Sequence, residues 1–421
     1  MTNKFDKGRT VVTDVEYAIF EPSPAPRIAK GGRAVKVWRG AQALPGAATE
    51  LRISADRTQA EKARSEGKTV MRVPSIPVRL IPQFTGQQPP TQGSPWGIAA
   101  VGADQLQPNS QGENVTVAIL DSGIDAQHAA FKSLITEKNY KDFTGKGLTD
   151  NLGHGTHCAG IIFGRPVNGV RIGVAPGIKN VLVGKIADRD FSTTTTVLRE
   201  AILWAVDSGA QVISLSVGLD FLGHQQALKL RGVSDRVATA KALNDYRDYT
   251  RFFDALMQHV VMPGAAAKSA LLIAACGNDS VPADQMRVPA TLPAVADNVI
   301  AVSAVDQAAG GAFTVAPFCN ALANLCAPGV NILSASPGQS DGLATMSGTS
   351  QAAPHVAAVA ALWWQNLANR TGEQPTPSAV RDEMMGAARR DRIVGDIDIE
   401  NIGRGLAIAP PPPPGKGRSP Y

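Results

Sequence analysis

Apolar runs that end in small or polar residues are the strongest constraint on how this 421-residue chain can fold. Residues 115–120 are continuously apolar or β-branched, as expected of a strand buried on both faces of a parallel sheet. Further apolar runs alternate with helical stretches along the chain. The runs lie near 180–186, 211–217, 270–275 and 298–305, and the helical stretches include 195–208 and 350–367. This alternation predicts an α/β fold, a doubly wound parallel sheet with helices on both faces.

Three chemically active residues follow or begin such segments, in the order Asp, His, Ser. Asp121 follows the first apolar run, His154 stands between two glycines, and Ser350 opens a predicted helix. Open α/β sheets bind ligands at the carboxyl ends of their strands, and a helix N-terminus favours developing negative charge. Taken singly, Asp121 and Ser350 could be ordinary caps or turns. Together, a carboxylate, an imidazole and a hydroxyl are the parts that acyl transfer by a serine nucleophile requires.

The sequence around these residues resembles the subtilisin-like serine proteases (subtilases, peptidase family S8). The matching motifs are VAILDSG at 117–123, GHGTH at 153–157 and GTSQAAP at 348–354. Cys158 extends the second motif to the Gly-Thr-His-Cys sequence of the proteinase K branch. The resemblance covers about residues 96–405 and implies a parallel sheet of the subtilisin type. It also implies roles for the three residues, with Ser350 as nucleophile, His154 as general base and Asp121 as the group that orients the imidazole.

The resemblance also identifies an oxyanion donor and a substrate cleft. Asn278, which follows the apolar run 270–275, matches the asparagine whose amide stabilises the oxyanion in the family. Loss of one such donor typically lowers turnover by about 10²–10³-fold. Family members bind substrate backbone as an added strand. The implied substrate-binding residues are Ser216, Val217, Gly218, Ala275, Cys276 and Gly277. Because these residues are small and uncharged, they favour apolar or loosely selective cleavage.

The resulting prediction is a serine endopeptidase that hydrolyses peptide bonds of proteins or peptides through an acyl-enzyme on Ser350. Two alternatives remain open. One is a narrow-specificity maturation protease that acts on a single partner or peptide. The other is a non-catalytic binding protein on the same scaffold.

Metal binding is not expected to be required. Many subtilases hold calcium near two loops, which correspond here to Ala129–Ala130 and to residues 164–169, and neither loop carries a carboxylate. Calcium prefers several oxygen ligands, usually with carboxylates among them. Calcium therefore stays possible, but its usual site is not supported. A zinc site on His154 and His157 is not expected, because no glutamate lies between them as in metalloprotease helices.

Two residues beside the motifs carry further expectations. The family usually has Met after its serine, and this chain has Gln351, which we interpret as a change on the surface of the helix. Cys158 lies four residues after His154, and the resemblance places it beneath the site. A bulky thiol reagent attached to Cys158 is therefore expected to inhibit. We expect His157 to be a packed histidine.

The chain divides into unequal parts. Residues 1–85 predict a small α+β appendage, with strands at 10–20 and 33–38, a helix at 57–67 and extended chain at 69–81. A propeptide and a retained accessory domain are both open interpretations of this appendage. The remaining parts are a linker at 86–95, a peptidase domain at 96–408 and a Pro-rich tail at 409–421. Three interpretations of a helical insertion at 219–269 are open: it shapes the cleft, it docks a regulatory partner, or it is a solvated excursion.

Charge and composition narrow the compartment and the partners. The net charge of +5 is spread among interspersed acidic and basic residues, so we expect no nucleic-acid partner. No apolar span reaches 18 residues, so we expect no membrane helix. The first residues lack the apolar region of a secretory signal, which predicts a cytoplasmic protein whose four cysteines are thiols.

Overall fold

The computed structural model describes residues 15–21, 50–85, 96–261, 268–281, 286–395 and 397–412. Its centre is an eight-stranded sheet in the order β14-β13-β12-β10-β6-β8-β7, with β15 also paired to β13. All neighbours are parallel except β13 and β14. The strands are β6 (Thr116–Asp121), β7 (Tyr140–Asp142), β8 (Asn180–Lys185), β10 (Val212–Leu215), β12 (Leu271–Ala275), β13 (Val299–Gln307), β14 (Phe313–Val315) and β15 (Leu325–Pro328). The predicted α/β class is confirmed.

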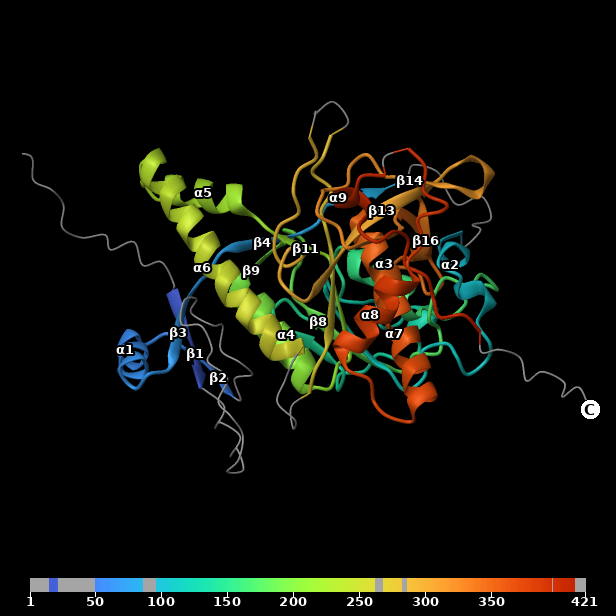
Figure 1. Ribbon diagram of the computed structural model, residues 1–421, viewed down its shortest axis with the longest axis horizontal. Coiled ribbons are helices and arrows are strands. Elements are labelled where there is room, and N and C mark those ends of the chain that lie inside the picture. The colour runs from blue at the N-terminus through green and yellow to red at the C-terminus, as the bar shows by residue number, and fades with distance from the viewer. Residues whose placement is uncertain are drawn as a thin grey trace, which may run out of the picture.

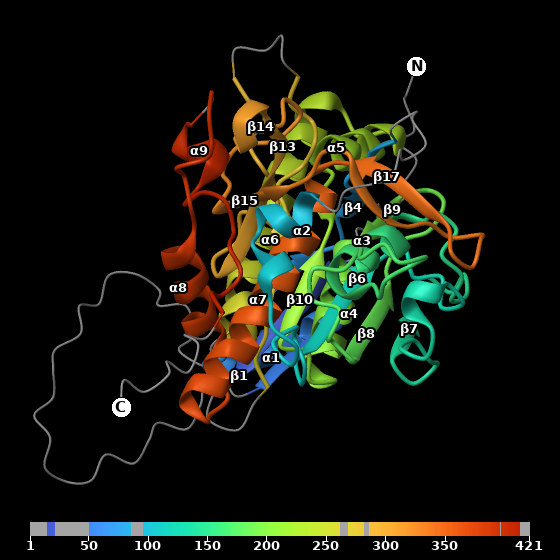
Figure 2. The same ribbon diagram turned by 90° about the vertical axis from the view of Figure 1, so that its right-hand side faces the viewer.

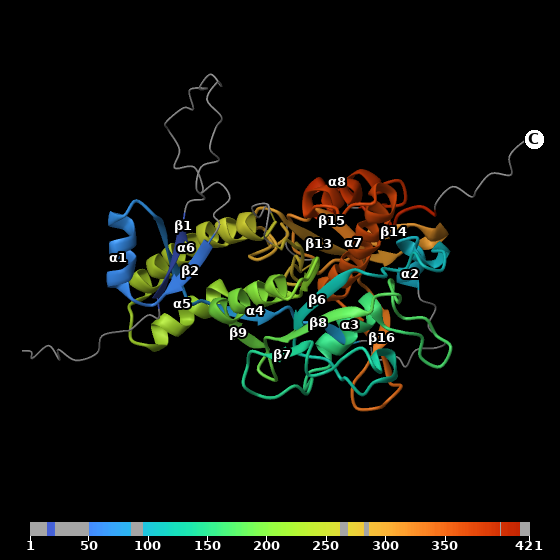
Figure 3. The same ribbon diagram turned by 90° about the horizontal axis from the view of Figure 1, so that it is seen from below.

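Helices cover both faces of this sheet (Figure 3). Along β6, Val117 and Ile119 join one apolar cluster with helices α3 and α7, whereas Ala118 and Leu120 join a second cluster with α4 and α6. Burial on both faces is why the strands are continuously apolar rather than alternating. The helices of this part are α2 (Trp96–Ala100), α3 (His154–Phe163), α4 (Thr195–Asp207), α7 (Thr349–Thr371), α8 (Pro377–Ala387) and α9 (Ile399–Ile402).

The N-terminal appendage is a three-stranded antiparallel sheet with one helix. Its elements are β1 (Val15–Glu21), β2 (Glu50–Ser54), α1 (Arg57–Ser65) and β3 (Thr69–Pro74), in the sheet order β2-β1-β3. Asp56 caps α1 by accepting a hydrogen bond from the Thr58 backbone N–H at 2.8 Å. The strand predicted at 33–38 and the first residues of the strand predicted at 10–20 lie outside the described residues.

The predicted insertion at 219–269 contains two helices, α5 (Phe221–Leu230) and α6 (Asp235–Val261), which follow β11 (Val217–Leu219). The N-terminal sheet lies against α6 (Figure 1). Phe20 of β1 and Val73 of β3 join the same apolar cluster as Phe253 of α6, and Arg72 pairs with Asp248 at 2.6 Å. The interpretation as a solvated excursion is therefore wrong for α6, because the chain's own N-terminal sheet covers part of this helix.

Two short strands follow the N-terminal sheet and pair with strands of the predicted peptidase domain. β4 (Pro77–Leu80) lies between β11 and β9 (Ser192–Thr194), and β5 (Phe84–Thr85) pairs with β17 (Leu343–Ser347), which also pairs with β16 (Ile332–Ala335). β4 and β9 lie side by side (Figure 2). No helix in the described part of the chain is both long and apolar enough to span a membrane.

Candidate active site

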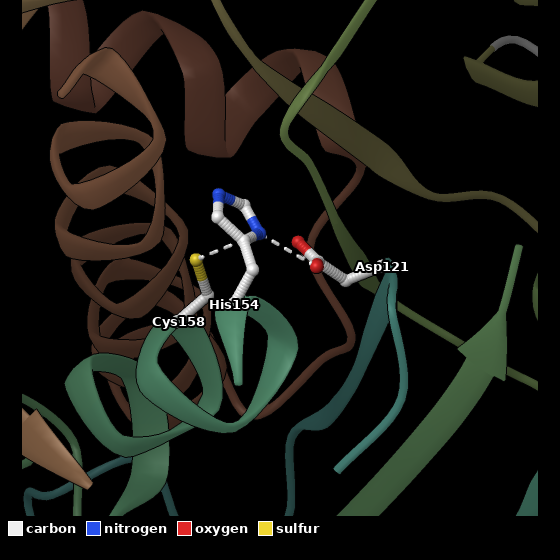
Figure 4. A group of neighbouring side chains, drawn as sticks. All are labelled: Asp121, His154 and Cys158. Carbon is white, nitrogen blue, oxygen red and sulfur yellow. Dashed lines mark hydrogen bonds and ion pairs between the residues drawn. The ribbon is translucent and has the colours of Figure 1, made fainter. Parts of the chain in front are cut away.

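Asp121 and His154 meet where a strand ends and a helix begins. Asp121 is the last residue of β6 and His154 is the first residue of α3. The His154 Nδ1–H donates to Asp121 Oδ1 at 2.7 Å, and both side chains are buried. The second ring nitrogen points away from Asp121 (Figure 4). Glycine is required at position 155, because a Cβ there would collide with the carbonyl oxygen of Gly123.

The electrostatic surroundings favour a charged imidazole at His154. Burial by itself lowers the pKa of His154, since it penalises the charged form. The Asp121 carboxylate and the Cys158 sulfur outweigh burial and raise that pKa well above the ordinary value. Asp121 therefore both orients the ring and stabilises the imidazolium that proton transfer would create.

Asp150 holds the start of α3 in place. Asp150 is buried, with 5% of the residue exposed. One carboxylate oxygen accepts from the Ser122 hydroxyl and the Gly153 backbone N–H, each at 2.9 Å. The other accepts from the backbone N–H of Thr156 at 2.9 Å and from its hydroxyl at 2.6 Å. Because Ser122 follows Asp121 directly, Asp150 ties the strand that carries Asp121 to the helix that carries His154.

Ser350 and Asn278 are joined through Thr349, the first residue of α7. The Asn278 Oδ1 accepts from the Thr349 backbone N–H and hydroxyl, each at 2.9 Å. These bonds leave the Asn278 amide N–H₂ directed outward, and it donates to the carbonyl of Pro82 at 2.6 Å. Ser350 lies in the first turn of the helix, where backbone N–H groups have no helical partner.

Cys158 contacts both Ser350 and His154. The Cys158 thiol donates to the Ser350 carbonyl at 3.2 Å, and its sulfur lies 3.9 Å from His154 Nδ1. His154 Nε2 is buried without a hydrogen-bond partner among the described residues. The Ser350 hydroxyl donates to the Ile81 carbonyl at 3.4 Å instead. The Ser350 hydroxyl is therefore directed toward the Ile81 carbonyl of the bound segment. His154 Nε2, which would accept the hydroxyl proton, makes no hydrogen bond to the hydroxyl in this structure.

The cleft beside Ser350 holds the chain's own residues 77–85. The Ile81 N–H donates to the Ser216 carbonyl at 3.0 Å, and the Leu80 N–H donates to the Phe191 carbonyl at 2.9 Å. In the antiparallel pairing of β4 with β11, Val217 lies opposite Leu80 and Gly218 lies opposite Arg79. On the other side of Ser350, β5 pairs with β17. A peptide is thus bound by strand addition on both sides of the nucleophile candidate.

The predicted substrate-binding residues fall into two groups, of which one contacts the backbone of the bound segment and the other lies in the apolar clusters and beneath Asn278. Ser216, Val217 and Gly218 contact the bound segment through its backbone. Ala275 shares an apolar cluster with Ile81, whereas Cys276 belongs to the cluster on the other face of the sheet, which also contains Leu80. Gly277 donates its N–H to the Thr349 hydroxyl at 3.1 Å, which places it beneath Asn278.

Three neighbouring residues refine or correct expectations. The interpretation of Gln351 as a change on the helix surface is wrong, because its side chain is fully buried. His157 is packed, as expected, with Nε2 near the Ile332 and Ala344 carbonyls at 3.0 and 3.1 Å, and burial lowers its pKa to about 3. The Cys158 thiol is fully buried, and burial raises its pKa, so a reagent reaches it only when the structure opens.

Sequence reasoning did not identify several contributors. Asp150 carries a local signal, since an aspartate ahead of a predicted helix is a typical capping residue. Thr349 stands next to Ser350 in the motif, but its bonds to Asn278 join residues 71 positions apart. Ile81 and Pro82 carry no signal of their own, because only the tertiary structure brings them to Ser350.

The site has limited capacity for metals. Within the described residues, Asp121, His154 and Cys158 are the group of possible ligands that converges, with ligand atoms within 4.8 Å of one another. A soft cation there would take Nδ1 from Asp121 and would disrupt the pair. Residues near the usual calcium region do not fit that ion. The Arg165 N–H donates to the Ala130 carbonyl and its guanidinium to the Lys132 carbonyl, at 3.1 and 3.2 Å.

A parallel sheet that presents this Asp–His pair, with a serine at a helix start beside a strand-addition cleft, defines a serine-type endopeptidase. The chain belongs to the subtilase family, whose model matches residues 112–403. It is 31% identical over 293 residues to the major intracellular serine protease of Bacillus subtilis (strain 168), covering 68% of this chain and 80% of that protein. It is 31% identical over 279 residues to subtilisin DY of Bacillus licheniformis (64% and 84% covered) and 29% identical over 283 residues to thermitase of Thermoactinomyces vulgaris (66% and 85% covered).

Proposed function

We propose that the chain hydrolyses peptide bonds of protein or peptide substrates through an acyl-enzyme on Ser350. The observation that carries this proposal is the Ile81 carbonyl, which lies against the Ser350 hydroxyl in a segment bound by strand addition. In the proposed reaction the Ser350 oxygen attacks the carbonyl carbon, and its proton passes to His154 Nε2. The imidazolium then protonates the departing amine, and water hydrolyses the ester by the reverse transfer.

Asp121 and Asn278 have separate roles in this mechanism. Asp121 keeps Nδ1 protonated, so that Nε2 is the nitrogen that accepts the serine proton. Asn278 donates its amide to the oxyanion, and its orientation is supported by the two bonds from Thr349 to its carbonyl oxygen. No required cofactor enters this scheme.

Active-site labelling tests the assignment directly. A fluorophosphonate should modify Ser350 alone, and Ser350→Ala should abolish both labelling and turnover while the near-UV circular dichroism stays native. Asp121→Asn should lower kcat by about 10⁴-fold, because the wrong tautomer is then favoured. Labelling at another serine, or peptide hydrolysis by Ser350→Ala, would contradict the mechanism. A folded wild-type chain with neither labelling nor turnover would favour the non-catalytic alternative.

We also propose that residues 1–85 act as a tethered inhibitor, as a propeptide would. The bound chain places Ile81 against Ser350, but the Asn278 amide holds the next carbonyl, that of Pro82. The carbonyl under attack therefore lacks its oxyanion donor, and the bond that follows it is an Ile–Pro bond. Outside the cleft, the Glu16 carboxylate pairs with the buried Arg199 of α4 at 2.6 Å and anchors the N-terminal sheet.

The substitution Pro82→Ala distinguishes between two interpretations of residues 1–85, a tethered inhibitor and a retained accessory domain. Pro82→Ala replaces the Ile–Pro bond with an ordinary peptide bond. Mass spectrometry should then find cleavage after Ile81, and the activity of the protein should rise. The Pro82→Ala, Ser350→Ala double variant should stay intact and is the control for cleavage by other proteases. An uncut Pro82→Ala chain of unchanged activity would favour the accessory interpretation.

A cytoplasmic, narrow-specificity role is part of the same proposal. Two relatives are named intracellular serine proteases, one from Bacillus subtilis and one from Paenibacillus polymyxa. A protease that works among the proteins of its own cell needs restraint, and the segment in the cleft provides it. Proteome-wide cleavage profiling of cells that contain wild-type protein or Ser350→Ala tests this role, since a narrow enzyme should change few substrates.

A further inference from the structure

The segment in the cleft also contacts the insertion at 219–269 through a charged side chain. Among residues 77–81, the charged side chain is Arg79, and its guanidinium Nε lies 3.1 Å from Asp220 Oδ2. Val78 and Leu80 on either side of it are buried. Arg79 lies opposite Gly218 in the pairing of β4 with β11 and is the third residue before Pro82. Asp220 follows β11 directly and precedes α5.

Asp220 is held in place by a contact within the insertion itself. Its Oδ1 accepts from the Gly223 backbone N–H at 2.9 Å and caps α5. A Cβ at position 223 would collide with the Asp220 carboxylate, so glycine leaves the space that this carboxylate fills. The Asp220 side chain is only 16% exposed. A carboxylate that is already ordered loses little side-chain entropy when a cation binds to it.

Asp220 also contacts the backbone of the bound chain. Its N–H donates to the Pro77 carbonyl at 2.9 Å. The same residue therefore extends the strand pairing and presents a negative charge to the side chain two positions further along. The other oxygen of this carboxylate is occupied by the cap, which leaves Oδ2 for the incoming cation.

We propose that Asp220 is a specificity-determining residue that selects substrates with arginine or lysine at the third position before the scissile bond. This inference rests on the proposed peptidase function and names its substrate class: extended peptides with a basic residue there and apolar residues around it. The Arg79 side chain is 52% exposed, so the pair contributes as a partly solvated ion pair does. Such pairs correspond to a preference of about 2–5-fold over an uncharged side chain.

Competition between peptides measures this preference. Peptides of sequence Pro-Val-X-Leu-Ile-Ala-Gln-Phe, with X as Arg, Gln or Glu, are mixed in pairs with the full-length protein, and products are counted by mass spectrometry. The ratio of kcat/KM values does not depend on how many clefts the chain's own segment blocks, because both peptides compete for the same open molecules. Arg should exceed Gln by about 2–5-fold and exceed Glu by more, and the ratios should fall as salt is raised.

Asp220→Asn removes the charge and keeps the cap, because asparagine caps helices as well as aspartate does. The Arg-to-Gln ratio should then fall to about 1 in this variant. Asp235→Asn is the matched control, because Asp235 is an exposed aspartate of the same insertion that pairs with Lys229 instead. It should keep the wild-type ratio.

The outcomes separate this inference from the proposed function. A wild-type ratio of one, or a ratio unchanged in Asp220→Asn, would overturn the role of Asp220 while cleavage of all peptides upholds the peptidase. Failure to cleave any peptide, together with no fluorophosphonate labelling, would instead overturn the peptidase itself.

Discussion

Gln351→Met is expected to stabilise the protein, because Gln351 buries an amide that nothing in the described structure satisfies. Its side chain is fully buried in the first turn of α7, and neither Oε1 nor Nε2 has a hydrogen-bond partner among the described residues. Burying an unpaired amide costs about 1–3 kcal/mol by protein mutational data. Methionine has a similar unbranched shape and carries no such group. The free energy of unfolding should therefore rise by about 1–3 kcal/mol.

Urea denaturation in a Ser350→Ala background, where self-digestion cannot occur, measures this change. Gln365→Met is the matched control on the same helix. Its amide is also buried, but Oε1 accepts from the Gly112 N–H at 2.8 Å and Nε2 donates to the Asn109 carbonyl at 2.9 Å. That substitution should destabilise by about 1–3 kcal/mol, because it leaves the Gly112 N–H unpaired. If Gln351→Met is neutral or destabilising, the reasoning about an unsatisfied amide is refuted.

Four further expectations concern the site and its surroundings. The value of kcat/KM should rise with pH to a midpoint well above 6.5, because His154 must lose its proton to act as a base and its pKa is raised; a midpoint at or below 6.5 would contradict this. Asp150→Asn should lower kcat by about 10²-fold with little change in KM, since an amide nitrogen cannot accept the bonds from Thr156, and steady-state kinetics decide this. EGTA should leave the melting temperature of the protein unchanged, and a clear drop would point to a calcium site. Iodoacetamide should alkylate Cys158 slowly in native protein and faster in urea, and rapid native alkylation would show that the buried thiol is accessible.

Local patterns in the sequence predicted five of the eight strands of the central sheet and the residues that carry the chemistry, but they did not predict β7, β14 or β15. The apolar runs predicted β6, β8, β10, β12 and β13 within one or two residues, because burial on both faces requires an uninterrupted apolar strand. The motifs identified Asp121, His154, Ser350 and Asn278. Each of these residues lies at the end of a strand or the start of a helix, so the residues next to it in the sequence were enough to recognise it.

Contacts between residues far apart in the sequence were determined by the tertiary structure alone. Ile81 reaches Ser350 across 269 positions, and Arg72 reaches Asp248 across 176. No local pattern carries such information, since the composition of residues 77–85 is equally suited to an exposed linker. The burial of Gln351 has the same origin: its neighbours along the helix do not show whether the face it occupies is covered. Local propensity and motif spacing thus identified the functional residues of this protein, and tertiary packing determined which of these residues contact one another.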